Sequence, residues 1–122
     1  MNPLIETKNI SFSFEKKMTL HSVSLKINPH SITSIVGPNG AGKTTLLKVL
    51  AGILSPHEGE LSLNHKSYFS YSPKELAQQI AFVSPDIEPV FSISVYDFIL
   101  LGRSPFLSGL SFEGKKDYEI VD

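Results

Sequence analysis

The 122-residue sequence contains no cysteine, which excludes disulfide frameworks and thiolate metal sites. No apolar run approaches the roughly 20 residues needed to cross a bilayer, so a role at a membrane would require a partner. There is also no basic surplus, because the formal net charge is −1, and a nucleic-acid partner is therefore not expected. The remaining composition, 41% hydrophobic and 19% charged, is typical of an ordinary globular protein.

Hydrophobic patterning predicts strands near the N-terminus and helices farther along the chain. Alternating apolar and polar residues, or short apolar runs, predict strands over 10–14, 23–27, 31–36, 61–63 and 80–83. Helical spacing begins at Lys43 and meets a stop at Gly52. Capping signals at Ser72 and Ser94 predict helices over 73–79 and 95–101, and a further helix begins near 115.

One string matches a phosphate-binding loop, G-x-x-x-x-G-K-[ST], with Gly37, Gly42, Lys43 and Thr44 at the defined positions. Glycines allow the backbone to aim successive N–H groups at phosphate oxygens, the lysine reaches the β- and γ-phosphates, and the threonine hydroxyl binds Mg²⁺. A predicted strand precedes the loop and a predicted helix follows it, as such a loop requires. A chance glycine-rich turn is the competing interpretation, but average glycine usage gives it a probability of roughly 0.5%.

The loop and the helix after it, Leu46 to Gly52, resemble the ATP-binding subunits of ABC transporters. The turn over Pro56 to Glu60 resembles the turn that leads into the next strand in that family. The segment from Val95 to Pro105, which ends in Leu-Gly-Arg-x-Pro, resembles importer ATPases for iron-siderophore, haem and vitamin B12 complexes.

This resemblance implies an α/β fold of the P-loop NTPase class. An antiparallel β-subdomain would lie beside a parallel core that the strand ending at Val36 begins. Residues 1–122 would be a partial nucleotide-binding domain with an incomplete core. The last predicted helix stops as its apolar residues Ile120 and Val121 begin, which also indicates a truncated chain.

Position by position, the resemblance implies an ATP site made of Phe14, Gly37, Pro38, Asn39, Gly40, Ala41, Gly42, Lys43, Thr44 and Thr45. Phe14 occupies the position of the aromatic residue that stacks on adenine, where the family usually has tyrosine. Its alternative role is that of a core residue at the end of a strand. Thr44 would bind Mg²⁺, so ATP and Mg²⁺ are the expected cofactors.

The resemblance also implies partners. A transmembrane permease subunit would dock within Ile87–Pro105, and a second ATPase subunit would complete a dimer at the cytoplasmic face of the membrane. Phe91, Phe98 and Phe106 are either core residues or part of that docking groove, and the sequence leaves this choice open.

The chain departs from the family pattern at the positions that ATP hydrolysis requires. Pro85 stands where the family has a glutamine that helps to hold Mg²⁺ and the attacking water, and Asp86 is an alternative ligand one position later. Leu107-Ser108-Gly109-Leu110 mimics the signature motif but comes too early and reads as a loop. No strand ending in Asp-Glu is present, and no switch histidine. The four histidines, His21, His30, His57 and His65, read as surface or turn residues without metal-ligand spacing.

Three functions follow from these observations. The leading one is ATP binding as the N-terminal portion of an importer ATPase that, when complete, hydrolyses ATP to drive uptake of an iron-siderophore, haem or cobalamin-type compound. The second is a truncated, non-catalytic remnant that retains only nucleotide binding or partner docking. The third, an unrelated phosphate-loop kinase or GTPase, is disfavoured by Phe14 and by the absence of an Asn-Lys-x-Asp string.

Overall fold

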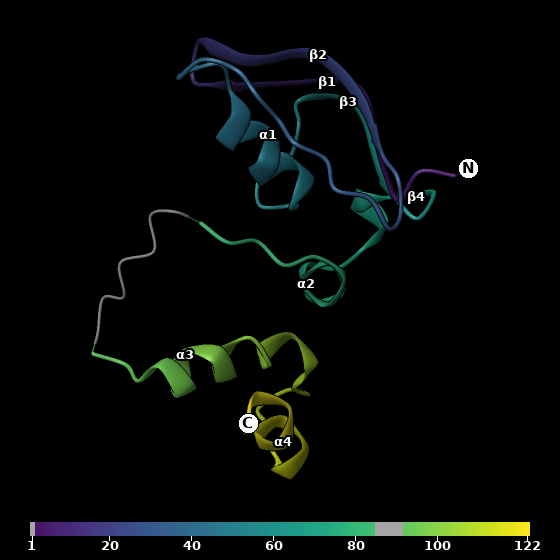
Figure 1. Ribbon diagram of the computed structural model, residues 1–122. Helices are drawn as coiled ribbons and strands as arrows, with labels where there is room; N and C mark the ends of the chain where they lie inside the picture. The colour runs from purple at the N-terminus through teal and green to yellow at the C-terminus, as the bar shows by residue number, and fades with distance from the viewer. Residues whose placement is uncertain (1, 85–91) are drawn as a thin grey trace. The chain divides into compact units, whose positions relative to one another are not determined.

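The computed structural model describes residues 2–84 and 92–122, which fall into two units, Met1–Leu76 and Ala77–Asp122. The first unit is built on a four-stranded antiparallel sheet in the order β2-β1-β3-β4 (Figure 1). Its strands are β1 (Ile5–Phe14), β2 (Lys17–Ile27), β3 (Glu58–Leu63) and β4 (Lys66–Ser67). The expected N-terminal antiparallel subdomain is therefore confirmed.

β1 and β2 form a hairpin closed by a two-residue turn, Glu15 and Lys16. The turn places Phe14 directly opposite Lys17, and the pairing runs to Ile5 opposite Ile27. Glu15 has a φ of 51°, in the left-handed region that tight hairpin turns require. The short turn sets the register at its own end, where Phe14 and Ser13 pair with Lys17 and Met18. The register then shifts between Phe12 and Ser13, and again farther along the hairpin.

The core of the first unit lies between the sheet and α1 (Lys43–Leu50) (Figure 1). α1 buries Thr45, Leu46, Val49 and Leu50, a spacing that places them on one helical face. The sheet contributes the buried side chains of Ile10, Phe12, Leu20, Leu61 and Leu63. Apolar burial between sheet and helix thus positions the start of α1, which carries the predicted phosphate loop.

The capping box predicted at Ser72 is confirmed. The Ser72 N–H donates to Glu75 Oε2 at 2.6 Å, and the Glu75 N–H donates to Ser72 Oγ at 3.2 Å. This reciprocal pair satisfies two N–H groups at the start of α2 (Pro73–Gln79). Before it lies a short 3₁₀ helix, η1 (Tyr68–Ser70). α2 begins in the first unit and ends in the second.

The second unit contains α3 (Val95–Leu101), the 3₁₀ helix η2 (Ser104–Phe106) and α4 (Lys115–Val121). The Ser94 hydroxyl accepts the Asp97 N–H at 3.1 Å, as the capping signal predicted. Arg103, just after α3, pairs with Asp117 on α4 at 2.9 Å. Its guanidinium also lies 4.4 Å from the centre of the Phe106 ring. Arg103 therefore ties both helical segments of this unit together.

Two predicted strands are not formed. Residues 31–36 and 80–83 have no regular structure, and three of their apolar side chains are largely exposed: Ile32 at 99%, Val36 at 89% and Val83 at 85%. A strand is held by hydrogen bonds to a neighbouring strand. Within residues 2–84 and 92–122 neither segment has such a neighbour, so the expected parallel core is not begun at Val36. Ile120, expected to face a core, is 55% exposed.

Candidate nucleotide-binding site

The predicted phosphate loop leads directly into α1. Gly42 is the N-cap residue, with a φ of 92°, and its carbonyl accepts the Leu46 N–H at 2.8 Å as the first helical hydrogen bond. Before it, the Ala41 N–H donates to the Pro38 carbonyl at 3.2 Å and closes a turn. The first turn of α1 contains no acidic residue. The positive end of the helix dipole therefore faces the loop without a neutralising side chain, an arrangement that favours an anion.

Lys43 reaches back across the loop. Its Nζ donates to the Gly37 carbonyl at 2.8 Å and to the Pro38 carbonyl at 2.7 Å. Both carbonyls belong to the start of the loop, so the ammonium group spans it from end to end. A cation held in this position supplies a strong donor to a phosphate that the loop encloses.

Thr44 and Thr45 face opposite environments although they are neighbours. Thr45 is 9% exposed and belongs to the buried face of α1, whereas Thr44 is exposed. Both line the cavity described below, and Thr44 has the more accessible side chain of the two. Hydroxyl, phosphate and water oxygens are the ligands that Mg²⁺ prefers. This donor set fits the expected Mg²⁺ ion at Thr44.

Two of the three loop glycines are favoured at their positions for different structural reasons. A Cβ added to Gly42 would lie 2.8 Å from the Thr19 carbonyl oxygen and 3.1 Å from Leu20 Cδ2, so only glycine fits against β2. Gly40 has a φ of 81° but nothing within 4 Å, so its backbone conformation alone favours glycine. Gly37 would meet only ordinary contacts. The tightest contact in the loop is thus the one that docks it onto β2.

A cavity of about 410 Å³ brings the predicted base platform and the loop together. Phe14 comes from the end of β1, and the loop follows about 25 residues later in the chain. The cavity is lined by Phe14, Lys17, Thr19, Asn39, Gly40, Gly42, Lys43, Thr44 and Thr45. The predicted residues Gly37, Pro38 and Ala41 belong to the loop but do not line this cavity.

Lys17 and Thr19 were not among the predicted site residues. Both lie at the start of β2, on the cavity wall. One sequence signal could have found Lys17. The strand alternation ends at Phe14, and a two-residue turn before the next strand places Lys17 opposite it.

Phe14 lies at the edge of an aromatic cluster. Its ring is 52% exposed, and the ring of Phe12, which is 7% exposed, lies 4.9 Å away at 80°. The His57 ring packs on Phe12 at 4.9 Å and 33°, with Nδ1 3.2 Å from Ser13 Oγ. Phe14 is therefore supported from the core while much of its surface stays accessible, which fits a stacking platform better than a core residue.

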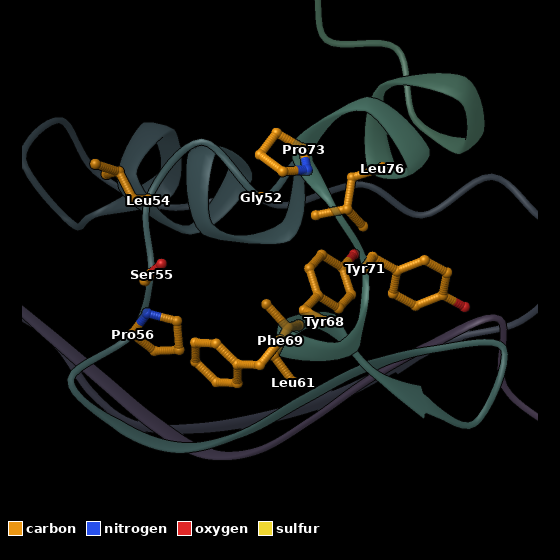
Figure 2. A pocket seen from close by; sticks show the side chains of 10 residues that line it. All are labelled: Gly52, Leu54, Ser55, Pro56, Leu61, Tyr68, Phe69, Tyr71, Pro73 and Leu76. Carbon is orange, nitrogen blue, oxygen red and sulfur yellow. The ribbon is translucent and has the colours of Figure 1, made fainter. Parts of the chain in front are cut away.

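A second cavity in the first unit, of about 240 Å³, is mostly apolar (Figure 2). Its lining residues are Gly52, Leu54, Ser55, Pro56, Leu61, Tyr68, Phe69, Tyr71, Pro73 and Leu76. Tyr68 anchors this cavity, because its hydroxyl donates to the Leu50 carbonyl at 2.7 Å. Burial raises the pKa of Tyr68 to about 12. The lining includes no carboxylate, amine or imidazole, so this cavity lacks groups for acid–base chemistry near neutral pH.

Among the other predicted positions, those that the structure describes do not line the nucleotide cavity. Pro85 and Asp86, at the position of the family glutamine, lie outside the described residues. Leu107-Ser108-Gly109-Leu110 forms part of a turn, closed by the Ser111 N–H to the Ser108 carbonyl at 3.0 Å, as expected for a loop. All four histidines are exposed, and the described ranges contain no cluster of residues suited to hold a metal ion.

The sequence is similar to those of known proteins. The family model described as ABC transporter matches residues 20–119. A "Probable iron chelatin transport ATP-binding protein" of Helicobacter pylori is 42% identical over 107 residues, which are 86% of this chain and 42% of that protein. The hemin import ATP-binding protein HmuV of Bradyrhizobium diazoefficiens is 37% identical over 102 residues, 84% of this chain and 38% of its own length.

The fold is also similar to that of solved structures. The crystal structure of a nucleotide-free ATP-binding cassette from an ABC transporter matches with a TM-score of 0.72 and 28% identity, over 98% of this chain and 46% of that one. The chain thus spans less than half the length of the proteins it matches. The family match covers most of residues 1–122 and includes the whole loop. The chain therefore belongs to the ABC transporter family and carries sequence of its ATP-binding domain.

Proposed function

We propose that this chain binds ATP with Mg²⁺ as the N-terminal portion of an ABC importer ATPase. The observation that carries the proposal is the cavity shared by Phe14, the phosphate loop and the start of α1. It combines an aromatic face, a loop of backbone N–H groups, a lysine ammonium and an exposed threonine hydroxyl. These are the parts that an adenine nucleotide with a magnesium ion requires.

Each part has a distinct role in binding. Phe14 stacks on the adenine ring, and the loop N–H groups with the α1 N-terminus hold the phosphates. Lys43 exchanges its two carbonyl acceptors for oxygens of the β- and γ-phosphates. The Thr44 hydroxyl oxygen would bind Mg²⁺, and a bound Mg²⁺ ion would neutralise part of the phosphate charge.

Hydrolysis needs groups beyond those in this sequence. A water must be oriented at the γ-phosphate, and the developing charge must be stabilised. The sequence has no strand ending in Asp-Glu and no Leu-Ser-Gly-Gly motif. We therefore expect residues 1–122 to bind ATP with little turnover, and the complete protein to hydrolyse it as a dimer. A turnover of residues 1–122 within the usual enzyme range of about 1 to 10³ s⁻¹ would contradict this expectation.

The proposal extends to the class of compound that the complete protein would transport. The Leu-Gly-Arg-x-Pro segment and the names of the two relatives support an iron-siderophore, haem or cobalamin-type compound. Uptake of a ferric siderophore, haemin and cobalamin by cells that lack the gene, with and without the complete protein, tests this. Uptake of all three compounds that is the same with and without the complete protein would contradict it.

The permease would dock within Ile87–Pro105, of which the structure describes residues 92–105. α3 is almost entirely apolar, yet only Leu100 is buried within its unit. Val95 is 78% exposed and Phe98 44%. Because so apolar a face is unfavourable in water, it supports a partner at this helix. Within the described ranges, no helix is long and apolar enough to cross a membrane.

A non-catalytic nucleotide-binding protein is the second candidate, and Pro85 favours it, because proline lacks a side chain that can orient water or Mg²⁺. A reading frame that continues into signature and Asp-Glu motifs, with ATPase activity in its product, would contradict this alternative.

Magnesium-dependent nucleotide binding tests the main proposal. The wild-type chain should bind ATP more tightly with Mg²⁺ than with EDTA. Thr44→Val should remove the Mg²⁺ effect, whereas Thr33→Val, at an exposed threonine outside the cavity, should leave it unchanged. An unchanged Mg²⁺ effect in Thr44→Val, or an equal loss of it in Thr33→Val, would contradict the proposal.

A further inference from the structure

The two-residue turn at Glu15 and Lys16 fixes the place of Lys17. Because Phe14 and Lys17 are direct partners across the antiparallel pair, their Cβ atoms lie on one face of the hairpin, about 4.5–5.5 Å apart. That face borders the nucleotide cavity, and both residues line it. Lys17 is therefore set beside the proposed adenine platform.

The start of β2 is also docked on the phosphate loop. The Thr19 carbonyl oxygen lies 2.8 Å from the place that a Gly42 Cβ would occupy, and the Thr19 hydroxyl donates to the Lys17 carbonyl at 3.3 Å. Thr19 therefore connects the two: it packs against Gly42 of the loop and donates a hydrogen bond to the backbone of Lys17. The position of Lys17 relative to the loop is therefore determined by packed backbone and not only by a flexible side chain.

Lys17 and Lys43 are the two cationic residues that line this cavity. Lys43 spans the loop and donates to two carbonyls. In the described part of the chain, no carboxylate forms an ion pair with Lys17. Its charge is thus available to an anion that enters between the platform and the loop.

We propose that Lys17 binds the α-phosphate of the nucleotide. This inference rests on the proposed function, in which adenine lies on Phe14 and the β- and γ-phosphates lie in the loop. The α-phosphate links these two ends of the nucleotide, and Lys17 lies beside the adenine end on the same cavity wall. A cation there recognises ATP and ADP equally, because both carry that phosphate.

Titration of the 122-residue chain with ATP–Mg²⁺ and with ADP–Mg²⁺ tests the inference. Lys17→Gln should weaken the binding of both nucleotides by the same factor, about five- to tenfold, because glutamine keeps an N–H donor and loses only the charge. Lys17→Arg should restore most of the affinity. Lys16→Gln, which changes a neighbouring lysine in the turn outside the cavity, should change neither affinity.

Three results would overturn the inference: unchanged affinities in Lys17→Gln, a loss confined to ATP, or an equal loss in Lys16→Gln. Melting curves of the variants show whether a loss of binding reflects unfolding, and Lys17→Arg keeps the test valid if Lys17→Gln unfolds. Absence of ATP binding by the wild-type chain, or an unchanged affinity in Lys43→Gln, would instead contradict the proposed function itself.

Discussion

The carbonyl oxygen of Thr19 lies 2.8 Å from the place that a Gly42 Cβ would occupy. This close approach joins β2 to the phosphate loop at the residue that caps α1. The loop is therefore positioned by the sheet as well as by its own turn, and glycine at 42 is required for packing as well as for φ.

Gly42→Ala should destabilise the chain far more than Gly40→Ala. Both residues have positive φ, so each alanine costs about 1 kcal/mol of backbone strain. Only Gly42→Ala adds a clash with Thr19, and overpacking costs a further 1–3 kcal/mol or so. Urea denaturation should show this difference, together with weaker ATP binding in Gly42→Ala. Equal losses of stability in the two variants would contradict the role of the contact.

Phe12→Leu should weaken ATP binding although Phe12 does not line the cavity. Phe12 holds the Phe14 ring at 4.9 Å and 80°, and such pairs contribute about 0.5–1.5 kcal/mol. Loss of this support should lower ATP affinity by roughly two- to tenfold. Phe69→Leu, at an exposed phenylalanine in the second cavity, is the control and should leave affinity unchanged. The same affinity in Phe12→Leu and wild type would show that Phe14 needs no support.

Tyr68→Phe should destabilise the first unit by about 1–2 kcal/mol, because the Leu50 carbonyl loses its donor. Leu50 is the last residue of α1, and carbonyls at a helix end lack partners within the helix. Equilibrium unfolding at pH 7 checks the size of this loss. A loss below a few tenths of a kcal/mol would mean that water replaces the hydroxyl.

The loss of stability in Tyr68→Phe should also depend on pH. Burial raises the pKa of Tyr68 from 10.0 to about 12, so above pH 10 the folded chain keeps a proton that the unfolded chain loses. The stability that this tyrosine contributes is present below pH 10 and is lost as the pH rises toward 12. The difference in stability between wild type and Tyr68→Phe should therefore shrink over this range. Parallel pH profiles would contradict the burial of the phenol.

The Asp117 carboxyl in the second unit should titrate below its usual range. The Gly114 N–H bond to Oδ2, at 3.0 Å, lowers its pKa most, and the bond from Arg103 lowers it further. The stability this carboxylate contributes is present above its ordinary pKa of 3.8 and is lost as the pH falls through the depressed pKa.

An NMR titration of the Gly114 amide measures this pKa. Arg103→Met should raise the midpoint only partway toward 3.8, because the Gly114 bond, the larger cause, remains. Lys115→Met is the control, since Lys115 pairs with Glu119 instead. A midpoint that does not move in Arg103→Met would show that the ion pair leaves the carboxyl unaffected.

Local signals in the sequence were sufficient for much of the fold. Ser72 and Glu75 stand three residues apart before an apolar run, and they form the reciprocal hydrogen bonds that this spacing predicts. Alternation located only the C-terminal parts of β1 and β2, residues 10–14 and 23–27, and over 23–27 the side chains on one face are less exposed than those on the other. The N-terminal parts of both strands were not predicted. The phosphate loop was readable because its glycines, lysine and threonine are needed at fixed spacings, within one segment of chain.

Interactions between segments far apart in the chain could not be predicted from the sequence. The apolar runs at 31–36 and 80–83 have strand composition, but a strand also needs a paired neighbour, which their own residues do not specify. The docking of Thr19 on Gly42 and the bond from Tyr68 to Leu50 depend on register and packing across the sheet and helix. The platform role of Phe14 stays a prediction, as does the replacement of the family glutamine by Asp86.

Calorimetric titration of the 122-residue chain with ATP–Mg²⁺ tests the central claim most directly. The wild-type chain should bind one ATP. Lys43→Ala should weaken binding at least tenfold, because charge-assisted bonds to the phosphates contribute more than about 1.4 kcal/mol. Lys48→Ala, which removes a lysine from the last turn of the same helix, should leave the affinity unchanged. No binding by the wild-type chain, or equal affinities in wild type and Lys43→Ala, would contradict the account.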